Sequence, residues 1–211
     1  ALKRRGITPE AIRQIMIDIG PRPVDITLSW KNLYAYNRKI IDPIADRYFF
    51  VQEPRELVVK AVPRDFTAHI LLHPDYPRRG TRTFEVRTVK GEARLLVSDS
   101  DVAIFKGGSA LRLMELFNVE IDAVDETGIT AHFLSEPYEE ARRLGAPLIH
   151  WLPSTGGVSC SVMMPDGTFV NGLAEETLRG VSADRVVQFE RFGFVRVDEA
   201  GKRIVVFFAH K

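Results

Sequence analysis

Short runs of alternating hydrophobic and polar residues fill the chain from about residue 47 onward, and they constrain its fold more than any other feature. A period of two is typical of β-strands with one buried face. Ten such runs can be traced: ELVVKAV, FTAHILL, TRTFEVRTV, ARLLVS, ALRLMELFNVEIDAV, GITAHFL, PLIHWL, VSCSVMM, VVQFERFGFVRV and RIVVFFAH. Turn signals such as PRRG, KGE, DETG and PDG separate them. Many short strands with few helices favour antiparallel barrels or sandwiches over alternating strand–helix units.

The first part of the chain has helical periodicity instead. A helix is expected over residues 8–19, with Thr8 as its N-cap and a proline at the first helical position. The segment PRPVD, residues 21–25, should break the chain. A second helix is expected to start from Ser29 and to stop at the Asp-Pro pair that ends with Pro43.

The clearest strand pattern covers residues 111–123. Its odd positions are apolar except for Glu115, and the even positions Arg112, Asn118, Glu120 and Asp122 are polar, so a single strand with Arg112 on the water-facing side is expected. The segment EPYEEARRLGA, residues 136–146, predicts a short surface helix ended by Gly145.

The stretch VVQFERFGFVRVD, residues 186–198, has strand composition but fails to alternate, because its apolar set changes face near Gly193. A β-bulge or kink at Gly193 would explain the change. A strand buried on both faces, passing between two barrels, explains the phenylalanines equally well. A strict strand would point Gln188 and Arg191 to opposite faces, whereas a bent one would let both reach one surface pocket.

Composition bounds the class of protein. The chain has 211 residues, of which 45% are hydrophobic and 27% charged, and this is ordinary for a globular fold. No apolar run approaches the ~20 residues of a membrane-spanning helix, so no membrane partner is expected. The one cysteine suits a reducing compartment, and the cytoplasm is the expected location. A formal net charge of +1 weakens a nucleic-acid interpretation without excluding it.

Residue sets for catalysis or metal binding are not recognisable. Cys160 lies in an alternating run without a glycine turn or nearby histidine, so a buried core thiol is expected. His69 and His73 would be ~13 Å apart along a strand, too far for one metal ion. His150 is interpreted as a structural histidine. Arginine, lysine and glutamine beside aromatic residues suit the recognition of single-stranded bases.

Six stretches occur in an order that carries a family resemblance: ALKRRGITPEAIRQIM, SWKNLYAYNRKIIDPIADRYFFV, HPDYPRRGTRTFEV, RLMELFNVEI, LIHWLP and VVQFERFGFVRVD. Together they resemble the anticodon-binding region of the class I glutamyl- and glutaminyl-tRNA synthetases, in the branch that builds this region from β-barrels. RLMELFNVEI is similar to the archaeal or eukaryotic glutamyl type.

The resemblance implies a mainly β fold in which a helical connector precedes two six-stranded antiparallel β-barrels, the second inserted in the first. The implied division is residues 1–46 for the connector, 47–75 plus 150–211 for the proximal barrel, and 76–149 for the distal barrel. It also implies that the catalytic domain, which uses ATP and magnesium in the parent enzyme, is not in this chain. No catalytic residue, metal or cofactor is therefore expected here.

The same resemblance implies which residues contact RNA. Arg47, Gln188 and Arg191 correspond to family positions at the middle anticodon base, which is uridine for glutamate and glutamine. Arg112 corresponds to a position near the first base, and Lys106 lies in the loop that reads or neutralises the third. Met114 stands where glutaminyl enzymes carry a second arginine.

The leading hypothesis is an anticodon-binding module of a glutamate–tRNA ligase that binds tRNA(Glu), with tRNA(Gln) as a second candidate and no DNA. The same region of a glutaminyl enzyme is the alternative. A module that docks other translation proteins, through an edge strand such as RIVVFFAH, is an alternative of another class. A small hydrolase that uses Cys160 is the weakest hypothesis.

Overall fold

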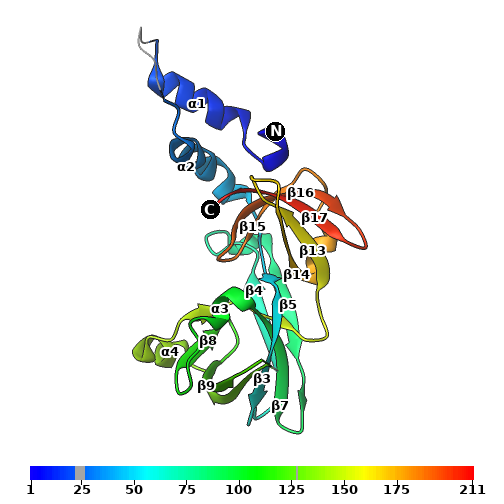
Figure 1. Cartoon of the computed structure of the whole chain (residues 1–211). Helices are drawn as coiled ribbons and strands as arrows, with labels where there is room; N and C mark the ends of the chain where they lie inside the picture. The colour runs from blue at the N-terminus through cyan, green and yellow to red at the C-terminus, as the bar shows by residue number, and fades with distance from the viewer. Residues whose placement is uncertain (22–26, 127) are drawn as a thin grey trace.

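The computed structural model describes residues 1–21, 27–126 and 128–211, and three parts follow one another along its length. Helices lie at one end, a first barrel in the middle and a second barrel at the other end (Figure 1). Most of the expected break at 21–25 lies outside the described residues.

The connector consists of two packed helices, α1 (Pro9–Ile19) and α2 (Trp30–Ile41), with short 3-10 turns η1 (Lys3–Arg5) and η2 (Asp42–Ile44) beside them. The Thr8 hydroxyl oxygen accepts a hydrogen bond from Ala11 N at 3.2 Å, which confirms the predicted N-cap. Ala11 and Leu33 are buried where the helices meet. The Ser29 side chain makes no capping bond, although α2 begins directly after it as expected.

The first barrel is formed by seven strand segments from both ends of the β region. They are β1 (Arg47–Tyr48), β2 (Phe50–Gln52), β13 (Val158–Met163), β14 (Phe169–Ala174), β15 (Val186–Phe189), β16 (Gly193–Ala200) and β17 (Ile204–His210). Their pairing order is β1-β15-β16-β17-β13-β14-β2. Because only Phe49 separates β1 from β2, the two ends of this order are one interrupted strand. The sheet therefore closes on itself with six strands.

The second barrel closes in the same way. Its segments are β3 (Pro54–Lys60), β7 (Glu92–Ser98), β8 (Ala110–Leu113), β9 (Asn118–Val124), β10 (Ile129–Ser135), β11 (Leu148–Ile149) and β12 (Leu152–Pro153). Their order is β11-β8-β9-β10-β3-β7-β12, with the short β6 (Thr88–Val89) beside β7. His150 and Trp151 alone separate β11 from β12, so one interrupted strand again joins both ends. Both barrels therefore have the six strands that the sequence resemblance implies.

The chain leaves the first barrel after β2, builds the whole second barrel, and returns at β13. The predicted insertion of one barrel into the other is confirmed. The expected division puts residues 54–60 in the first barrel, whereas β3 pairs with β7 and β10 in the second sheet.

Most of the described strand pairs are antiparallel, as expected, but four are not. The pairs β1–β15, β3–β10, β8–β11 and β13–β17 are parallel. Each joins segments far apart in sequence, as parallel pairing requires, since a tight hairpin can join only antiparallel strands. The expectation that RIVVFFAH forms an edge strand is also wrong, because β17 pairs with β16 on one side and β13 on the other.

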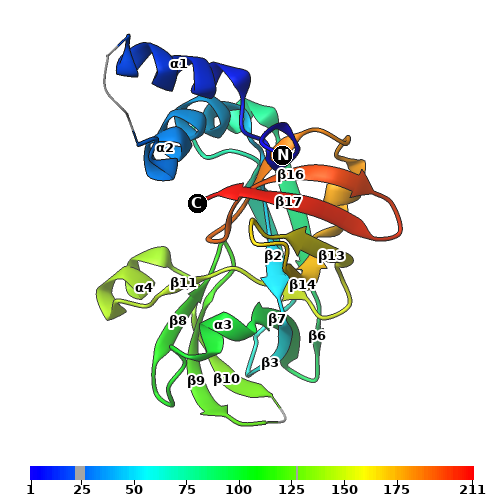
Figure 2. The ribbon, with the colours of Figure 1, turned by 45° about the horizontal axis from the view of Figure 1, so that its top comes forward.

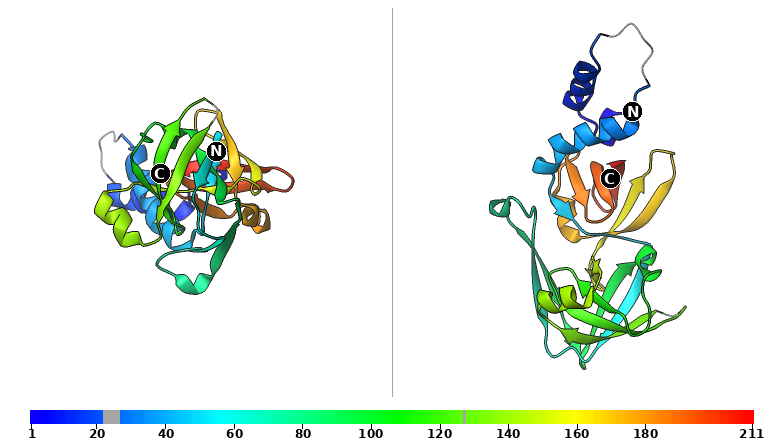
Figure 3. Two further views of the ribbon diagram at one scale, coloured as in Figure 1. Left: turned by 90° about the horizontal axis from the view of Figure 1, so that it is seen from below. Right: turned by 90° about the vertical axis from the view of Figure 1, so that its left-hand side faces the viewer.

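A two-stranded ribbon, β4 (Phe66–Leu71) and β5 (Thr81–Val86), connects the second barrel to the connector (Figure 3). Its tip carries the 3-10 turn η3 (Pro77–Arg79). Arg79 Nη1 donates to Pro43 O at 3.1 Å, and Arg79 Nη2 lies 2.9 Å from Asp46 Oδ1. His73 Nε2 lies 2.9 Å from Asp42 O. The ribbon therefore fixes the second barrel relative to the connector.

The expected single strand over residues 111–123 is wrong. β8 ends at Leu113, and a turn that contains Glu115 at φ +53° leads into β9 at Asn118. Arg112 is not water-facing but 7% exposed, because the segment from Ser135 onward covers its side of the sheet. Glu115, the exception in the alternation, marks the turn. The short helix α4 (Tyr138–Leu144), ended by Gly145 at φ +63°, matches its prediction.

Residues 186–198 form a hairpin, not one bent strand. β15 ends at Phe189 and β16 begins at Gly193, with Arg191 at φ +62° in the turn between them. The change of apolar face near Gly193 therefore comes from a reversal of the chain. In β16 the expected burial on both faces is present, because its first five residues are all buried, but Phe194 packs against Ile41 and Ala45 of the connector and not against the second barrel.

Candidate nucleic-acid interface

Arg47 and Gln188 lie side by side on the outside of the first barrel. β1 and β15 run parallel with Arg47 opposite Gln188, and the next pair, Tyr48 and Phe189, is buried. Arg47 Nε and Gln188 Oε1 are both shielded from solvent and have no hydrogen-bond partner among the described residues. An unpaired buried polar atom costs about 1 to 3 kcal/mol, so this pair is prepared to bind a ligand that supplies one acceptor and one donor.

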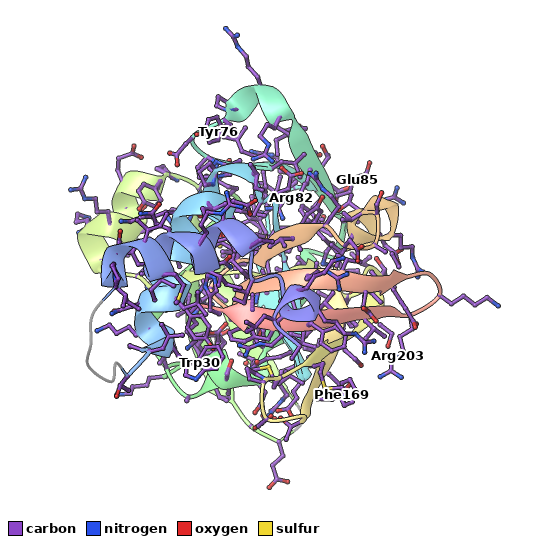
Figure 4. The ribbon with its side chains drawn as sticks, turned by 90° about the horizontal axis from the view of Figure 1, so that it is seen from above. Trp30, Tyr76, Arg82, Glu85, Phe169 and Arg203 are labelled. Atoms are coloured by element: carbon purple, nitrogen blue, oxygen red, sulfur yellow. The ribbon has the colours of Figure 1, made fainter. Side chains whose placement is uncertain are left out.

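Charged groups surround this pair. Glu190 follows β15, and its burial raises the pKa of its carboxyl group while Arg47, Arg82 and His73 oppose the rise. Arg82 on β5 forms a fully buried ion pair with Glu175, at 2.9 Å between Nη1 and Oε2. In Figure 4, Arg82 lies nearer the centre of the view than Tyr76 and Glu85 on either side of it along the chain.

Glu175 connects the ribbon to the first barrel. Its Oε2 accepts hydrogen bonds from Arg82 and from Phe49 N, and its Oε1 accepts one from the Thr177 hydroxyl. Burial raises the pKa of Glu175, while Arg82 and these hydrogen bonds oppose the rise. The Arg82 guanidinium also lies 4.9 Å from the centre of the Phe49 ring. These contacts hold the strand that carries Arg47.

Arg191 points from the β15–β16 turn toward the second barrel. Its Nη1 and Nη2 donate to Oδ2 and Oδ1 of Asp101 at 2.7 and 2.6 Å, a two-bond fork between guanidinium and carboxylate. Asp101 lies in α3 (Asp99–Val102), directly after β7, and its side chain is only 8% exposed. The fork therefore crosses from one barrel to the other.

His150 is a third member of this network. Its Nε2 lies 2.8 Å from Phe50 O, and its Nδ1 lies 3.2 Å from Arg191 Nη1. A carbonyl only accepts and a guanidinium only donates, so the imidazole is neutral with its proton on Nε2. Burial and the neighbouring Arg191 lower the pKa of His150 to about 4. The expected structural histidine is therefore also an acceptor for Arg191.

A cleft of about 380 Å³ opens beside this network between the two barrels, which are stacked along the long axis of the molecule (Figure 2). Its walls include Gln52, Arg191 and Phe192 from the first barrel and Ser100 and Asp101 from the second. Gln188 does not line it. The expected common pocket for Gln188 and Arg191 is therefore not this cleft: Gln188 lies beside Arg47, and Arg191 lines the cleft.

The two remaining predicted residues belong to the second barrel. Arg112 Nη1 donates to Asn118 Oδ1 at 3.2 Å and to Glu136 O at 2.7 Å, and burial lowers the pKa of Arg112. Its Nε is buried without a partner. Lys106 is exposed in the loop before β8, where the Ser109 side chain bonds to its backbone N and O.

Sequence reasoning did not find Asp101. Asp101 is one of two acidic residues in SDSDV, and nothing in this segment indicates a functional role for it. Its pairing with Arg191 spans 90 residues of sequence. His150 was noticed but not connected with Arg191, because the turn that brings them together was interpreted as part of a strand.

Other chemistry finds little support in the structure. Cys160 is 1% exposed, and burial raises the pKa of its thiol to about 12, as expected of a core residue and not of a nucleophile. In the described ranges, no three histidine, cysteine or acidic side chains are grouped as metal ligands would be. None of the described helices combines the length and the apolar character that crossing a membrane requires.

Two matches to one kind of domain decide the family. Residues 45–136 match the family described as "tRNA synthetases class I (E and Q), anti-codon binding domain", and residues 148–198 match a second family with the same description. The chain belongs to this family. The first match contains Arg47, Lys106 and Arg112, and the second contains Gln188 and Arg191. The resemblance described from the sequence is confirmed.

Curated relatives of this anticodon-binding chain carry the name glutamate–tRNA ligase. The chain is 48% identical to the enzyme of Thermococcus kodakarensis, 48% identical to that of Pyrococcus abyssi and 42% identical to that of Methanothermobacter thermautotrophicus. In each comparison all of this chain is matched, and it spans 36% of the relative's length.

Proposed function

We propose that the chain binds the anticodon loop of tRNA(Glu) as part of a longer glutamate–tRNA ligase, with tRNA(Gln) as a second candidate. The observation that carries the proposal is the pairing of Arg47 with Gln188, because each leaves a buried polar atom unpaired at one spot on the barrel. Membership of the family supports an anticodon loop as the ligand, and the names of the relatives support glutamate as the amino acid.

The unpaired atoms suit uracil. Its N3–H is a donor for Gln188 Oε1, and a flanking carbonyl oxygen is an acceptor for Arg47 Nε. Cytosine presents a bare N3 at the same position, which would face Gln188 Oε1 with no hydrogen between them. A site with this arrangement distinguishes the two pyrimidines by hydrogen bonding, at about 1 to 3 kcal/mol per well-placed pair.

The remaining predicted residues extend the proposal to the other anticodon bases. Arg191 adds contacts to the middle base from the cleft, Arg112 approaches the first base, and exposed Lys106 meets the third. Arg112 can do so through its Nη2 donors, since its Nη1 is bonded within the barrel and its Nε is buried.

In the longer protein, glutamylation would consume ATP with magnesium at a catalytic domain outside these 211 residues, and the cytoplasm is the proposed location. Assembly with other translation proteins remains a hypothesis. The third anticodon base is C for glutamate and G for glutamine. Charging of paired tRNAs that differ only there would separate a glutamyl enzyme that discriminates from one that does not.

The test is binding of anticodon stem-loops with each of the four middle bases to wild-type, Gln188→Ala and Arg47→Ala chains. Each variant should bind the uridine loop about 1 to 3 kcal/mol more weakly than wild type and lose most of the preference over cytidine. Arg87→Ala is the matched control and should change neither, because the Arg87 side chain lies between β5 and β6, is 80% exposed and pairs with Glu85. An equal loss for all four loops would leave only a phosphate contact and refute the base-reading assignment.

A further inference from the structure

The Arg191 side chain already makes hydrogen bonds within the protein. An arginine has five N–H donors in one plane. Asp101 takes one from each Nη, and His150 Nδ1 is within reach of the second on Nη1. What remains is the edge formed by Nε–H and the outer Nη2–H, and neither has a hydrogen-bond partner among the described residues.

The partners of Arg191 are themselves fixed. The Asp101 carboxylate is nearly buried and forms no second ion pair with the described residues, so it holds the guanidinium strongly. The His150 ring is oriented by Phe50 O at 2.8 Å, with the Ser98 hydroxyl 3.3 Å from the same nitrogen. Both partners come from the second barrel, while Arg191 comes from the first.

The Arg191 side chain nevertheless remains 36% exposed. It lines the cleft of about 380 Å³ together with Phe192, whose ring offers an apolar surface, and with the polar side chains of Gln52 and Ser100. A cleft of this size and mixed lining is typical of sites that admit a small planar group. The Arg191 side chain is therefore part of a wall that a ligand can reach.

We propose that Asp101 and His150 are positioning residues, which fix the Arg191 guanidinium so that its free Nε/Nη2 edge donates, from the cleft, to the O4 carbonyl of uracil, where cytosine carries an amino group. The proposal rests on the proposed function and adds to it two residues that do not touch the RNA. A guanidinium fixed beforehand loses less freedom on binding than a mobile one, which favours binding by about 2- to 10-fold. If Asp101 instead competed with RNA for Arg191, removal of its charge would strengthen RNA binding.

The decisive variant is Asp101→Asn, which keeps the shape of the side chain but removes its charge and one of the two acceptors. Asp99→Asn is the matched control, because Asp99 lies in the same helix and pairs with the exposed Arg55. The measurement is the dissociation constant of the 211-residue chain for stem-loops with each of the four middle bases, with thermal unfolding recorded for every variant.

We expect Asp101→Asn to weaken binding of the uridine loop about 3- to 10-fold and to reduce its preference over cytidine, while Asp99→Asn changes neither. Tighter binding would show that Asp101 competes with RNA and would overturn the proposal. An unchanged preference in a stably folded variant would also overturn it, because Asp101 would then only join the barrels.

His150→Gln provides a second test, independent of whether Asp101→Asn folds. Glutamine can keep the donor to Phe50 O but places no acceptor at the Nδ1 position. We therefore expect His150→Gln to weaken binding of the uridine loop, and to reduce its preference over cytidine, less than Asp101→Asn does. Arg191→Ala separates this inference from the function it rests on. If Arg191→Ala leaves the preference unchanged, the role of Arg191 itself is refuted; if only Arg191→Ala reduces it, the positioning role alone is refuted.

Discussion

At the scale of single residues, the structure shows where sequence pattern is informative. The buried state of Cys160 and the N-cap role of Thr8 depend on neighbours in sequence, so they were predictable. The burial of Arg112 was not, because the Glu136 carbonyl that accepts its hydrogen bond lies 24 residues away. The partner of Arg191 is still farther away, so hydrogen-bond networks across the barrels could not be read from the sequence.

His150 gives a pH-dependence that can be measured. Its folded-state pKa of about 4 lies below the ordinary value of 6.5, so between these values the unfolded chain binds a proton that the folded chain does not. The stability that neutral His150 contributes is therefore complete above pH 6.5 and is lost as the pH falls toward 4. Between pH 7 and pH 5 the free energy of unfolding should fall by about 2 kcal/mol more in the wild-type chain than in His150→Gln. If chemical denaturation shows the same fall in the free energy of unfolding for both chains, the lowered pKa of His150 is contradicted.

At the scale of elements, the hairpin of β15 and β16 contributes to the stability of the fold and also carries residues of the candidate site. Sequence composition predicted the strands, but the reversal at residues 190–192 was hidden because the turn carries Arg191 and Phe192 instead of the usual turn residues. Gly193 lies at φ +143°, and a Cβ atom built on it would lie 2.7 Å from His210 O. This glycine therefore lets β16 pass close to the end of β17.

Gly193→Ala should destabilise the chain by about 1 to 3 kcal/mol, since both the backbone angle and the contact with His210 O oppose a side chain. Gly91→Ala is the matched control: Gly91 also has a positive φ, +77°, but a Cβ there meets nothing within 4 Å. The difference between the two variants in urea unfolding reports the close approach together with the greater backbone strain at φ +143°. Equal losses would mean that backbone strain alone matters.

At the scale of the whole molecule, the alternation of residues predicted the β class. The family resemblance implied two barrels, the second inserted in the first. The closure of each barrel by one interrupted strand, 47–52 in the first and 148–153 in the second, could not be seen in the sequence. Strands of two or three residues give too little periodicity to detect. These two strands, with the ribbon β4–β5, position the candidate residues, which lie on the outside of the first barrel, in the cleft between the barrels and in the second barrel.

The central claim is that RNA bases are read where β1 and β15 meet, and chemical-shift mapping tests it most directly. An anticodon stem-loop with a middle uridine is titrated into the isotope-labelled chain, and the side-chain signals of Arg47 Nε–H and the Gln188 carboxamide are followed. We predict large shifts for both, with smaller shifts for Arg191, and weak shifts when the middle base is cytidine. Shifts confined to α1, to the exposed face of α2, or to any other surface away from β1 and β15 would contradict the account.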